Sequence, residues 1–289
     1  MERIARSLLA LLPLLCVAGF AGAGSITIGS SKDNTLFEPS ILGERSNGAG
    51  TAMFAGLTAT SGLRRAVIAF DVVTALPRGA VVTSATMRLV VTRQVFLAPA
   101  ADFAVHRLTA DWGEAGSDAG DPGGQGAEPM PGDATWSHRF FDLEFWATAG
   151  GDFDAMPSDA INIGTLGAHS WGGAAMAADV QAWRDTPTTN FGWIVRGDEA
   201  NGGLAREFAT RESLTEESRP ALEIEFTPPC AGDANRSGTV VFEDILVVLA
   251  NFGANYGDGW GPGDADLNGV VNFNDVLAVL ANFGAACPV

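Results

Sequence analysis

The chain has 289 residues and is strongly acidic, with Lys+Arg 17 against Asp+Glu 34 and a formal charge of −17 at pH 7. This charge repels phosphate backbones and anionic lipid headgroups, and the sequence has no basic patch, so nucleic-acid and membrane partners are excluded. Because hydrophobic residues make up 47% and charged residues 18%, we expect a folded chain, with one large domain followed by a small one.

The N-terminus has the pattern of a secretory signal peptide. Arg3 and Arg6 precede an apolar run over residues 8–20, and Ala21-Gly22-Ala23 supplies the small side chains that a cleavage site needs. The apolar run is shorter than the roughly 20 residues of a membrane-spanning helix. We therefore expect residues 1–23 to be removed and the mature protein to be secreted, either extracellular or at the cell surface.

Residues 24–228 have the pattern of a β domain. Short segments rich in β-forming residues are separated by Gly, Pro, Asn and Asp. They cover residues 25–30, 51–56, 65–72, 81–91, 103–108, 134–141, 191–197 and 221–227. This spacing predicts an antiparallel β-sandwich or jelly roll. One segment, residues 174–185, has helical composition and ends before Pro187, so we expect a single short helix crossing one mouth of the sandwich.

Several segments of this domain carry a family resemblance. They read SKDNTLFE, RRAVIAFDV, LPRGAVVTSATMRLVV, ADVQAWRDTPTTNFGWIV, AREFATRE and RPALEIEFTP. Together they resemble the DNRLRE-type jelly-roll domain, which is classed among the carbohydrate-binding modules (family 96-like), although Thr35 departs from the name-giving motif. The resemblance implies a jelly-roll fold and a polysaccharide ligand.

Tryptophans are the candidate ligand-binding residues of this domain, because the apolar face of a sugar packs well on an aromatic ring. Four of the seven tryptophans lie in or beside predicted loops: Trp112, Trp136, Trp146 and Trp171. A Gly-Pro-rich acidic segment lies between Trp112 and Trp136. It is either a solvated surface excursion, a saccharide-binding rim or a further calcium site.

The C-terminal segment, residues 229–289, contains an internal repeat. GDANRSGTVVFEDILVVLANFG begins at Gly232 and GDADLNGVVNFNDVLAVLANFG begins at Gly263, 31 residues later. A repeat of this length indicates a duplicated supersecondary unit. Each copy predicts a twelve-residue loop that leads into an apolar helix.

The loops have the ligand spacing of calcium sites. Oxygen-bearing side chains stand at alternate positions, a glycine occupies position 6 and an aspartate closes each loop at position 12. The expected ligands are Asp233, Asn235, Ser237, Thr239 and Asp244 in the first loop and Asp264, Asp266, Asn268, Val270, Asn272 and Asp275 in the second. Thr239 and Val270 contribute backbone carbonyls. We expect two calcium ions, with tighter binding in the second loop, which has three carboxylates against two.

This segment resembles a type I dockerin, a duplicated calcium-loop module. The resemblance implies a small all-α dockerin domain with two EF-hand-like loops, and a cohesin-like or other cell-surface protein as a partner. Apolar residues at helical spacing are expected to pack inward as its core. They are Phe242, Leu246, Leu249, Phe273, Leu277 and Leu280.

Cys230 and Cys287 are the two cysteines left after removal of the signal peptide. In an oxidising compartment they pair with each other or with another molecule. Because they bracket one compact segment, we expect an intramolecular disulfide, with two unpaired thiols as the alternative.

The sequence indicates no catalytic residues. Its three histidines lack a metal-binding spacing, and no nucleophile elbow, P-loop or dinucleotide fingerprint stands in a suitable context. Glu223 and Glu225 share one face of a predicted strand, and we interpret them as exposed residues rather than a catalytic pair.

The sequence therefore predicts an exported, non-catalytic carbohydrate-binding protein with a calcium-dependent dockerin module that acts in polysaccharide binding or degradation assemblies. Two alternatives stay open. One is a polysaccharide-degrading enzyme, a glycoside hydrolase or lyase, and the other is a structural protein of the cell envelope.

Overall fold

The structure is a computed structural model that describes residues 23–60 and 62–287. The expected signal peptide lies outside the described residues except for Ala23. Strands account for 36% of the chain and helices for 15%, so the protein is mainly β. Among the helices of the described residues, none is both long enough and apolar enough to cross a membrane.

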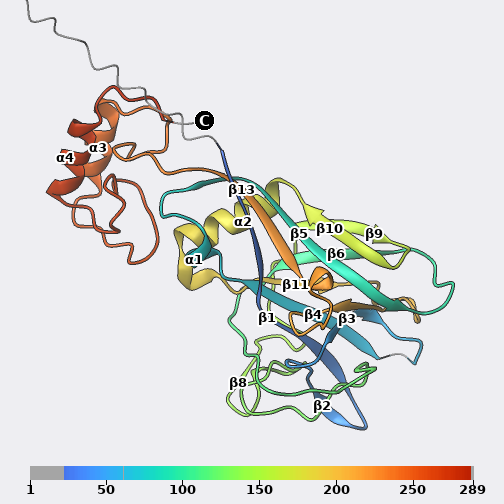
Figure 1. The fold of residues 1–289 in the computed structure, drawn as a ribbon. Helices are drawn as coiled ribbons and strands as arrows, with labels where there is room; N and C mark the ends of the chain where they lie inside the picture. The colour runs from blue at the N-terminus through green and yellow to red at the C-terminus, as the bar shows by residue number, and fades with distance from the viewer. Residues whose placement is uncertain (1–22, 61, 288–289) are drawn as a thin grey trace, which may run out of the picture.

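The first and larger part of the chain is an antiparallel β structure (Figure 1). Its strands are β1 (Gly24–Ser40), β2 (Gly43–Arg45), β3 (Ala52–Leu57), β4 (Leu63–Phe70), β5 (Val81–Gln94), β6 (Ala101–Arg107), β7 (His138–Phe140), β8 (Glu144–Phe145), β9 (Asp159–Ile163), β10 (Gly167–Gly172), β11 (Trp193–Arg196), β12 (Arg206–Ala209) and β13 (Ala221–Thr227). The predicted antiparallel sandwich of this region is confirmed.

The long strand β1 joins the two sheets of the sandwich. Its first half pairs with β13, where Gly24 lies opposite Phe226, and its second half pairs with β4, where Phe37 lies opposite Arg64. In the same way β3 pairs with both β12 and β4. The pairings β1–β13–β5–β12–β3–β4 therefore close on themselves, with β10 beside β5 and with β11, β6 and β9 extending from β4.

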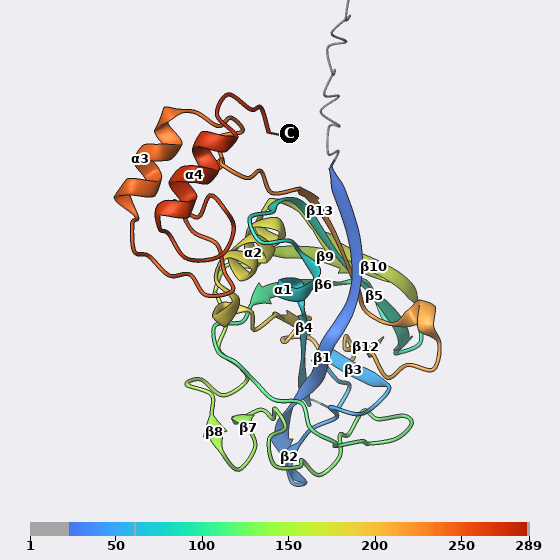
Figure 2. The same cartoon turned by 60° about the vertical axis from the view of Figure 1, so that its left-hand side comes forward.

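The prediction of a single helix in this part of the chain is wrong, because the described residues form two: the single turn α1 (Val72–Ala75), which Asp71 caps, and α2 (Ala174–Asp185). Short 3-10 turns lie at Pro187–Thr189 and Glu216–Ser218. Helix α2 forms over the predicted residues and lies at the end of the sandwich that faces the C-terminal segment (Figures 1 and 2). The Trp183 and Trp193 rings pack with centroids 4.4 Å apart. This contact anchors α2 to the core between the sheets.

The predicted strand over residues 134–141 is mostly irregular. Only His138–Phe140 forms a strand, β7, which pairs with β8 in a separate two-stranded sheet. Backbone groups here bond to the surrounding loop instead, as when Ala134 N donates to Gly113 O at 2.8 Å. The sequence pattern does not predict β2, β8, β9, β10 or β12, because these strands are short and lack a clear alternation of apolar and polar residues.

The prediction of a small all-α domain at the C-terminus is wrong. Within residues 230–287 the structure has two nine-residue helices, α3 (Phe242–Ala250) and α4 (Phe273–Ala281), and the remaining residues form turns and isolated bridges. The bridges join Thr239 to Ala286 and Asn255 to Val270. Loops rich in Gly, Asn and Asp occupy most of the segment, because those residues favour turns over helix.

The two copies of the repeat lie against each other with internal symmetry. Gly232 N donates to Ala265 O at 2.9 Å, and Gly263 N donates to Ala234 O at 3.0 Å. Both glycines have positive φ, 93° and 97°, and a Cβ on either would approach the equivalent helix of the other copy within 3.1 Å. Only glycine permits both this conformation and this close approach.

The predicted core of the C-terminal segment is also wrong. The buried residues are Ala234, Val240, Val248, Ala265, Val271, Val279 and Cys287. The residues expected to be buried, Phe242, Leu246, Leu249, Phe273, Leu277 and Leu280, are instead between 48% and 62% exposed. Each helix has apolar residues on two faces, and the valine-bearing face packs between the copies.

Candidate functional site

The second loop brings three predicted ligands together. Asp264, Asp266 and Asp275 each place one carboxylate oxygen within 4.8 Å of the others. Calcium–oxygen distances are about 2.3–2.6 Å, so oxygens on opposite sides of one ion lie up to about 5 Å apart. The three carboxylates are therefore close enough to share a single ion.

The electrostatics of this loop reflect the crowding of negative charge. Burial raises the pKa of Asp264, and the Asp275 carboxylate raises it further, against the opposing effect of the Gly269 N–H. Burial and the same Asp275 carboxylate raise the pKa of Asp266. A divalent cation at this position would relieve the repulsion between these groups.

Backbone hydrogen bonds hold the second loop in shape. Gly269 N lies 3.1 Å from each carboxylate oxygen of Asp264. At the other end of the loop, Asp275 accepts hydrogen bonds from Ala265 N at 2.8 Å and Asn272 N at 2.7 Å. Asp275 lies in the first turn of α4, so the residue that closes the loop also fixes the start of the helix.

The side chain of Asn272 is engaged with the helix. Its Oδ1 accepts a hydrogen bond from Asn274 N at 2.8 Å, and its Nδ2 donates to Val270 O at 3.1 Å. Asn272 is thus the N-cap of α4. The neighbouring Asn268 donates from its amide to Asp266 Oδ2 at 2.8 Å.

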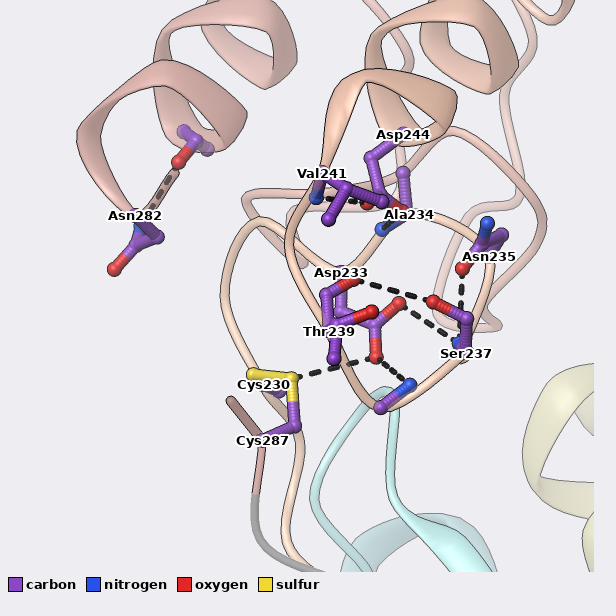
Figure 3. Close-up of a disulfide and its surroundings, with 12 residues drawn as sticks. Cys230, Asp233, Ala234, Asn235, Ser237, Thr239, Val241, Asp244, Asn282 and Cys287 are labelled. Atoms are coloured by element: carbon purple, nitrogen blue, oxygen red, sulfur yellow. Dashed lines mark hydrogen bonds between the residues drawn. A yellow bond between two sulfur atoms is a disulfide. The ribbon is translucent and has the colours of Figure 1, made fainter. Parts of the chain in front are cut away.

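The first loop has the same frame with fewer carboxylates (Figure 3). Asp233 accepts hydrogen bonds from Ser237 N at 3.0 Å and Gly238 N at 2.9 Å. Asn235 Oδ1 accepts from Ser237 N at 2.9 Å. Asp244 closes the loop from the first turn of α3 and accepts from Val241 N at 2.8 Å. Of the predicted side-chain ligands in this loop, two are carboxylates.

The disulfide between Cys230 and Cys287 is confirmed, with an S–S distance of 2.03 Å. Figure 3 shows it beside the first loop, and Cys287 Sγ lies 3.4 Å from Asp233 Oδ2. Because a disulfide sulfur carries no proton, this approach is a van der Waals contact. The same bond removes both cysteines as thiolate ligands, so they cannot form a metal site with Asp233.

Three of the four candidate sugar-stacking tryptophans are buried. Trp112 is 1% exposed, Trp146 is 5% exposed and Trp171 is fully buried. Their indole N–H groups donate to the backbone oxygens of Phe191, Thr135 and Phe103. The prediction that these three rings face a ligand is therefore wrong. Trp171 lies on β10 and packs in the main core, and Trp112 and Trp146 pack in a second buried cluster.

Trp136 is the remaining candidate, and it is half-buried. The guanidinium of Arg65 lies 4.9 Å from its ring centroid and 5.5 Å from that of Phe153. Arg65 and Phe153 also line a surface hollow of about 540 Å³, together with Thr109 and Asp152. Polar groups and a partly exposed aromatic cluster thus meet on one side of the sandwich.

The segment between the two repeat loops contacts the sandwich directly. Arg184 of α2 donates from Nη1 to Asp258 O at 2.9 Å, and Trp260 N donates to Asp185 O at 3.2 Å. A pocket of about 160 Å³ lies between the two parts, and Gly79, Asp233 and Trp260 are among its lining residues. The two parts of the chain are therefore joined by specific polar contacts as well as by the linker.

The two glutamates of β13 and two of the histidines have no neighbours that suggest catalysis among the described residues. Glu223 and Glu225 are exposed on β13, as the sequence predicted. His106 Nδ1 lies 2.8 Å from Asp154 O, and burial lowers the pKa of this histidine. His169 Nε2 lies 2.9 Å from Thr165 O.

Sequence reasoning missed one cluster of charged residues in the sandwich. Asp33, Glu114 and Glu212 each place a carboxylate oxygen within 4.8 Å of the others. They come from segments far apart in the chain, so no local motif could reveal them.

No protein-family model matches the chain, and the search of curated proteins finds no matching sequence.

Proposed function

We propose that this chain is an exported, non-catalytic binding protein whose C-terminal loops bind two calcium ions and whose helices α3 and α4 dock onto a protein partner. The observation that carries this proposal is the exposure of large apolar side chains at equivalent positions of both copies of the repeat. Each is between 48% and 62% exposed: Phe242, Leu246, Leu249, Phe252, Phe273, Leu277, Leu280 and Phe283.

Single exposed apolar residues are common on protein surfaces, whereas a concentration of them marks an interaction site. In each copy three of these side chains lie on the helix, and a phenylalanine, Phe252 or Phe283, lies just beyond its end. The two helices lie side by side at the outer end of the molecule (Figures 1 and 2). A partner with an apolar surface would remove this area from water. The internal symmetry offers such a partner two similar faces.

Calcium would control this docking through the two closing aspartates. Asp244 and Asp275 stand in the first turns of α3 and α4. An ion held by these carboxylates would tie each loop to the start of its helix, and so fix the direction of the apolar side chains. The resemblance of the loops to dockerin loops supports a cohesin-like or other cell-surface protein as the partner.

A photocrosslinking experiment tests this proposal. A photoreactive phenylalanine analogue replaces Phe242 or Phe273 in the full chain, which is then returned to the cells that produce it. We expect one defined protein adduct in calcium and its loss in a chelator. The control is the same analogue at Phe96, which is 88% exposed on the sandwich. Equal labelling from all three positions would contradict the proposal.

The second candidate function, polysaccharide binding by the sandwich, is supported by the hollow that Arg65 and Phe153 line beside Trp136. The aromatic rings would contact apolar sugar faces, while Arg65 and Asp152 would bond to hydroxyl groups. A glycan array of the wild type and Trp136→Ala tests it, and we expect binding that the substitution removes. An assay for sugar release on any bound glycan separates this function from that of a hydrolase or lyase.

A further inference from the structure

We propose that Asp33, Glu114 and Glu212 form a third cation site, in the sandwich and separate from the two C-terminal loops, which takes a hard divalent cation of the calcium class. This site does not depend on the proposed docking function. It rests on the position of three carboxylates and on two buried oxygen atoms that lack hydrogen-bond partners.

The three residues come from different segments. Asp33 lies on β1, Glu114 follows Trp112 in the acidic irregular segment, and Glu212 follows β12. One carboxylate oxygen of each lies within 4.8 Å of the others. This spread matches the span of about 5 Å across a single calcium ion.

The main observation is the burial of Asp33. Its side chain is fully buried, and its Oδ2 accepts hydrogen bonds from Ser30 Oγ and Arg211 N, each at 3.0 Å. Its Oδ1 is buried without a hydrogen-bond partner among the described residues, and the same is true of Glu212 Oε2. Buried carboxylate oxygens are costly to leave unpaired, so two in one cluster indicate a missing partner.

The charged groups of the cluster do not balance one another. Arg211 contacts the carboxylates of both Glu114 and Glu212. One guanidinium against three carboxylates leaves the cluster with two uncompensated negative charges when all are ionised.

The donor set favours calcium over other cations. All candidate ligands are carboxylate oxygens, and no thiolate or imidazole is among them, which suits a hard cation. The oxygens come from one strand, an irregular loop and a turn rather than from an octahedral frame. Calcium tolerates such irregular coordination, whereas magnesium does not.

The consequence of this site would be structural. An ion held by these three residues would fasten the acidic segment between Trp112 and Trp136 to β1 and to the turn after β12. The acidic segment lies at the end of the sandwich away from the C-terminal helices (Figures 1 and 2). Calcium would therefore stabilise both ends of the molecule through different residues.

Equilibrium dialysis of the full chain against labelled calcium tests the site. We expect Glu212→Gln to bind one ion fewer than the wild type. The matched control is Glu128→Gln, which removes the same charge from an exposed position in the acidic segment and should leave the number of ions unchanged. Equal numbers of ions in the wild type and Glu212→Gln would overturn the proposal, as expected if the cluster holds only a shared proton.

Limited proteolysis of the acidic segment provides a second measurement. We expect calcium to slow cleavage between residues 112 and 136 at least tenfold in the wild type, and to have no such effect in Glu212→Gln or Asp33→Asn. Failure of the two C-terminal loops to bind calcium would lower the total number of ions, but would leave this protection and the effect of Glu212→Gln intact. Equal protection in all three proteins would overturn the site.

Discussion

Arg236 of the first repeat loop binds Asp185, the last residue of α2, through both terminal nitrogens of its guanidinium group. Nη1 lies 2.9 Å from Oδ2 and Nη2 lies 2.8 Å from Oδ1. The same guanidinium lies 3.6 Å from the ring centroid of Trp260. Arg236, at position 4 of the loop, has a positive φ of 56°. A loop proposed to bind calcium thus also holds the C-terminal segment on the sandwich.

Substitution of Arg236 by alanine should loosen this junction. Hydrogen bonds to charged groups contribute about 2 kcal/mol, which corresponds to a roughly 30-fold change in an opening equilibrium. We expect the Trp260 amide, which donates to Asp185 O, to exchange its hydrogen roughly 30-fold faster. Arg219→Ala is the control, because Arg219 pairs loosely at 3.9 Å with the exposed Glu216. Unchanged exchange at Trp260 would show that the junction does not depend on Arg236.

The two loops should bind calcium with different affinities. The second loop gathers Asp264, Asp266 and Asp275, whereas the first has two carboxylates, and affinity rises with ligand charge. Calorimetric titration should resolve two loop sites, and Asp266→Asn should weaken the tighter one by at least about tenfold. Asp258→Asn, at a carboxylate that is 91% exposed, should leave both affinities unchanged. If Asp266→Asn weakened the looser site instead, the assignment would be wrong.

Substitutions on opposite faces of α3 should separate its core from its docking surface. Val248 is fully buried, so Val248→Ala should lower the free energy of unfolding by about 2 kcal/mol. Leu246 is 50% exposed, and Leu246→Ala should change the free energy by no more than about 0.5 kcal/mol. Chemical denaturation in calcium measures both. If Leu246→Ala were more destabilising than Val248→Ala, the leucine face of α3 would be its buried face.

Local chemistry in the sequence predicted much of the fold, whereas calcium binding by the two repeat loops stays a prediction. Helix α2 forms where apolar spacing and a following proline place it. The carboxylates of the second loop lie close together because their spacing is a local property. The orientation of α3 could not be predicted in this way. Both Leu246 and Val248 belong to apolar stripes, and the contact between the two copies decides which stripe is buried.

Tertiary contacts explain the other differences between sequence and structure. Trp171 stands among Gly, His and Ser residues that suggest a loop, yet it is fully buried and its ring packs against Phe208. The cluster of Asp33, Glu114 and Glu212 exists because β1, the acidic segment and the turn after β12 meet. The pattern of a single sequence does not reveal such contacts between distant segments.

The ion pairs around Glu199 should make stability depend on pH. Burial opposes ionisation of Glu199, but hydrogen bonds from Arg196 and Arg65 outweigh it and lower its pKa from 4.5 to about 2. A carboxyl group whose pKa is lowered on folding stabilises the folded state above its unfolded pKa. This contribution is lost as the pH falls toward the folded pKa. Here the loss falls between about pH 5 and pH 2 and amounts to at most about 3 kcal/mol.

Glu199→Gln should therefore be less stable than the wild type at pH 7, and the difference between the two proteins should shrink steadily from about pH 5 to pH 2. Urea denaturation at a series of pH values measures this difference. Glu216→Gln is the matched control, because Glu216 is 82% exposed and its substitution should give a difference that stays near zero. A constant gap between wild type and Glu199→Gln across this range would show that the two arginines do not lower the pKa of Glu199, and that its effect at neutral pH comes from packing.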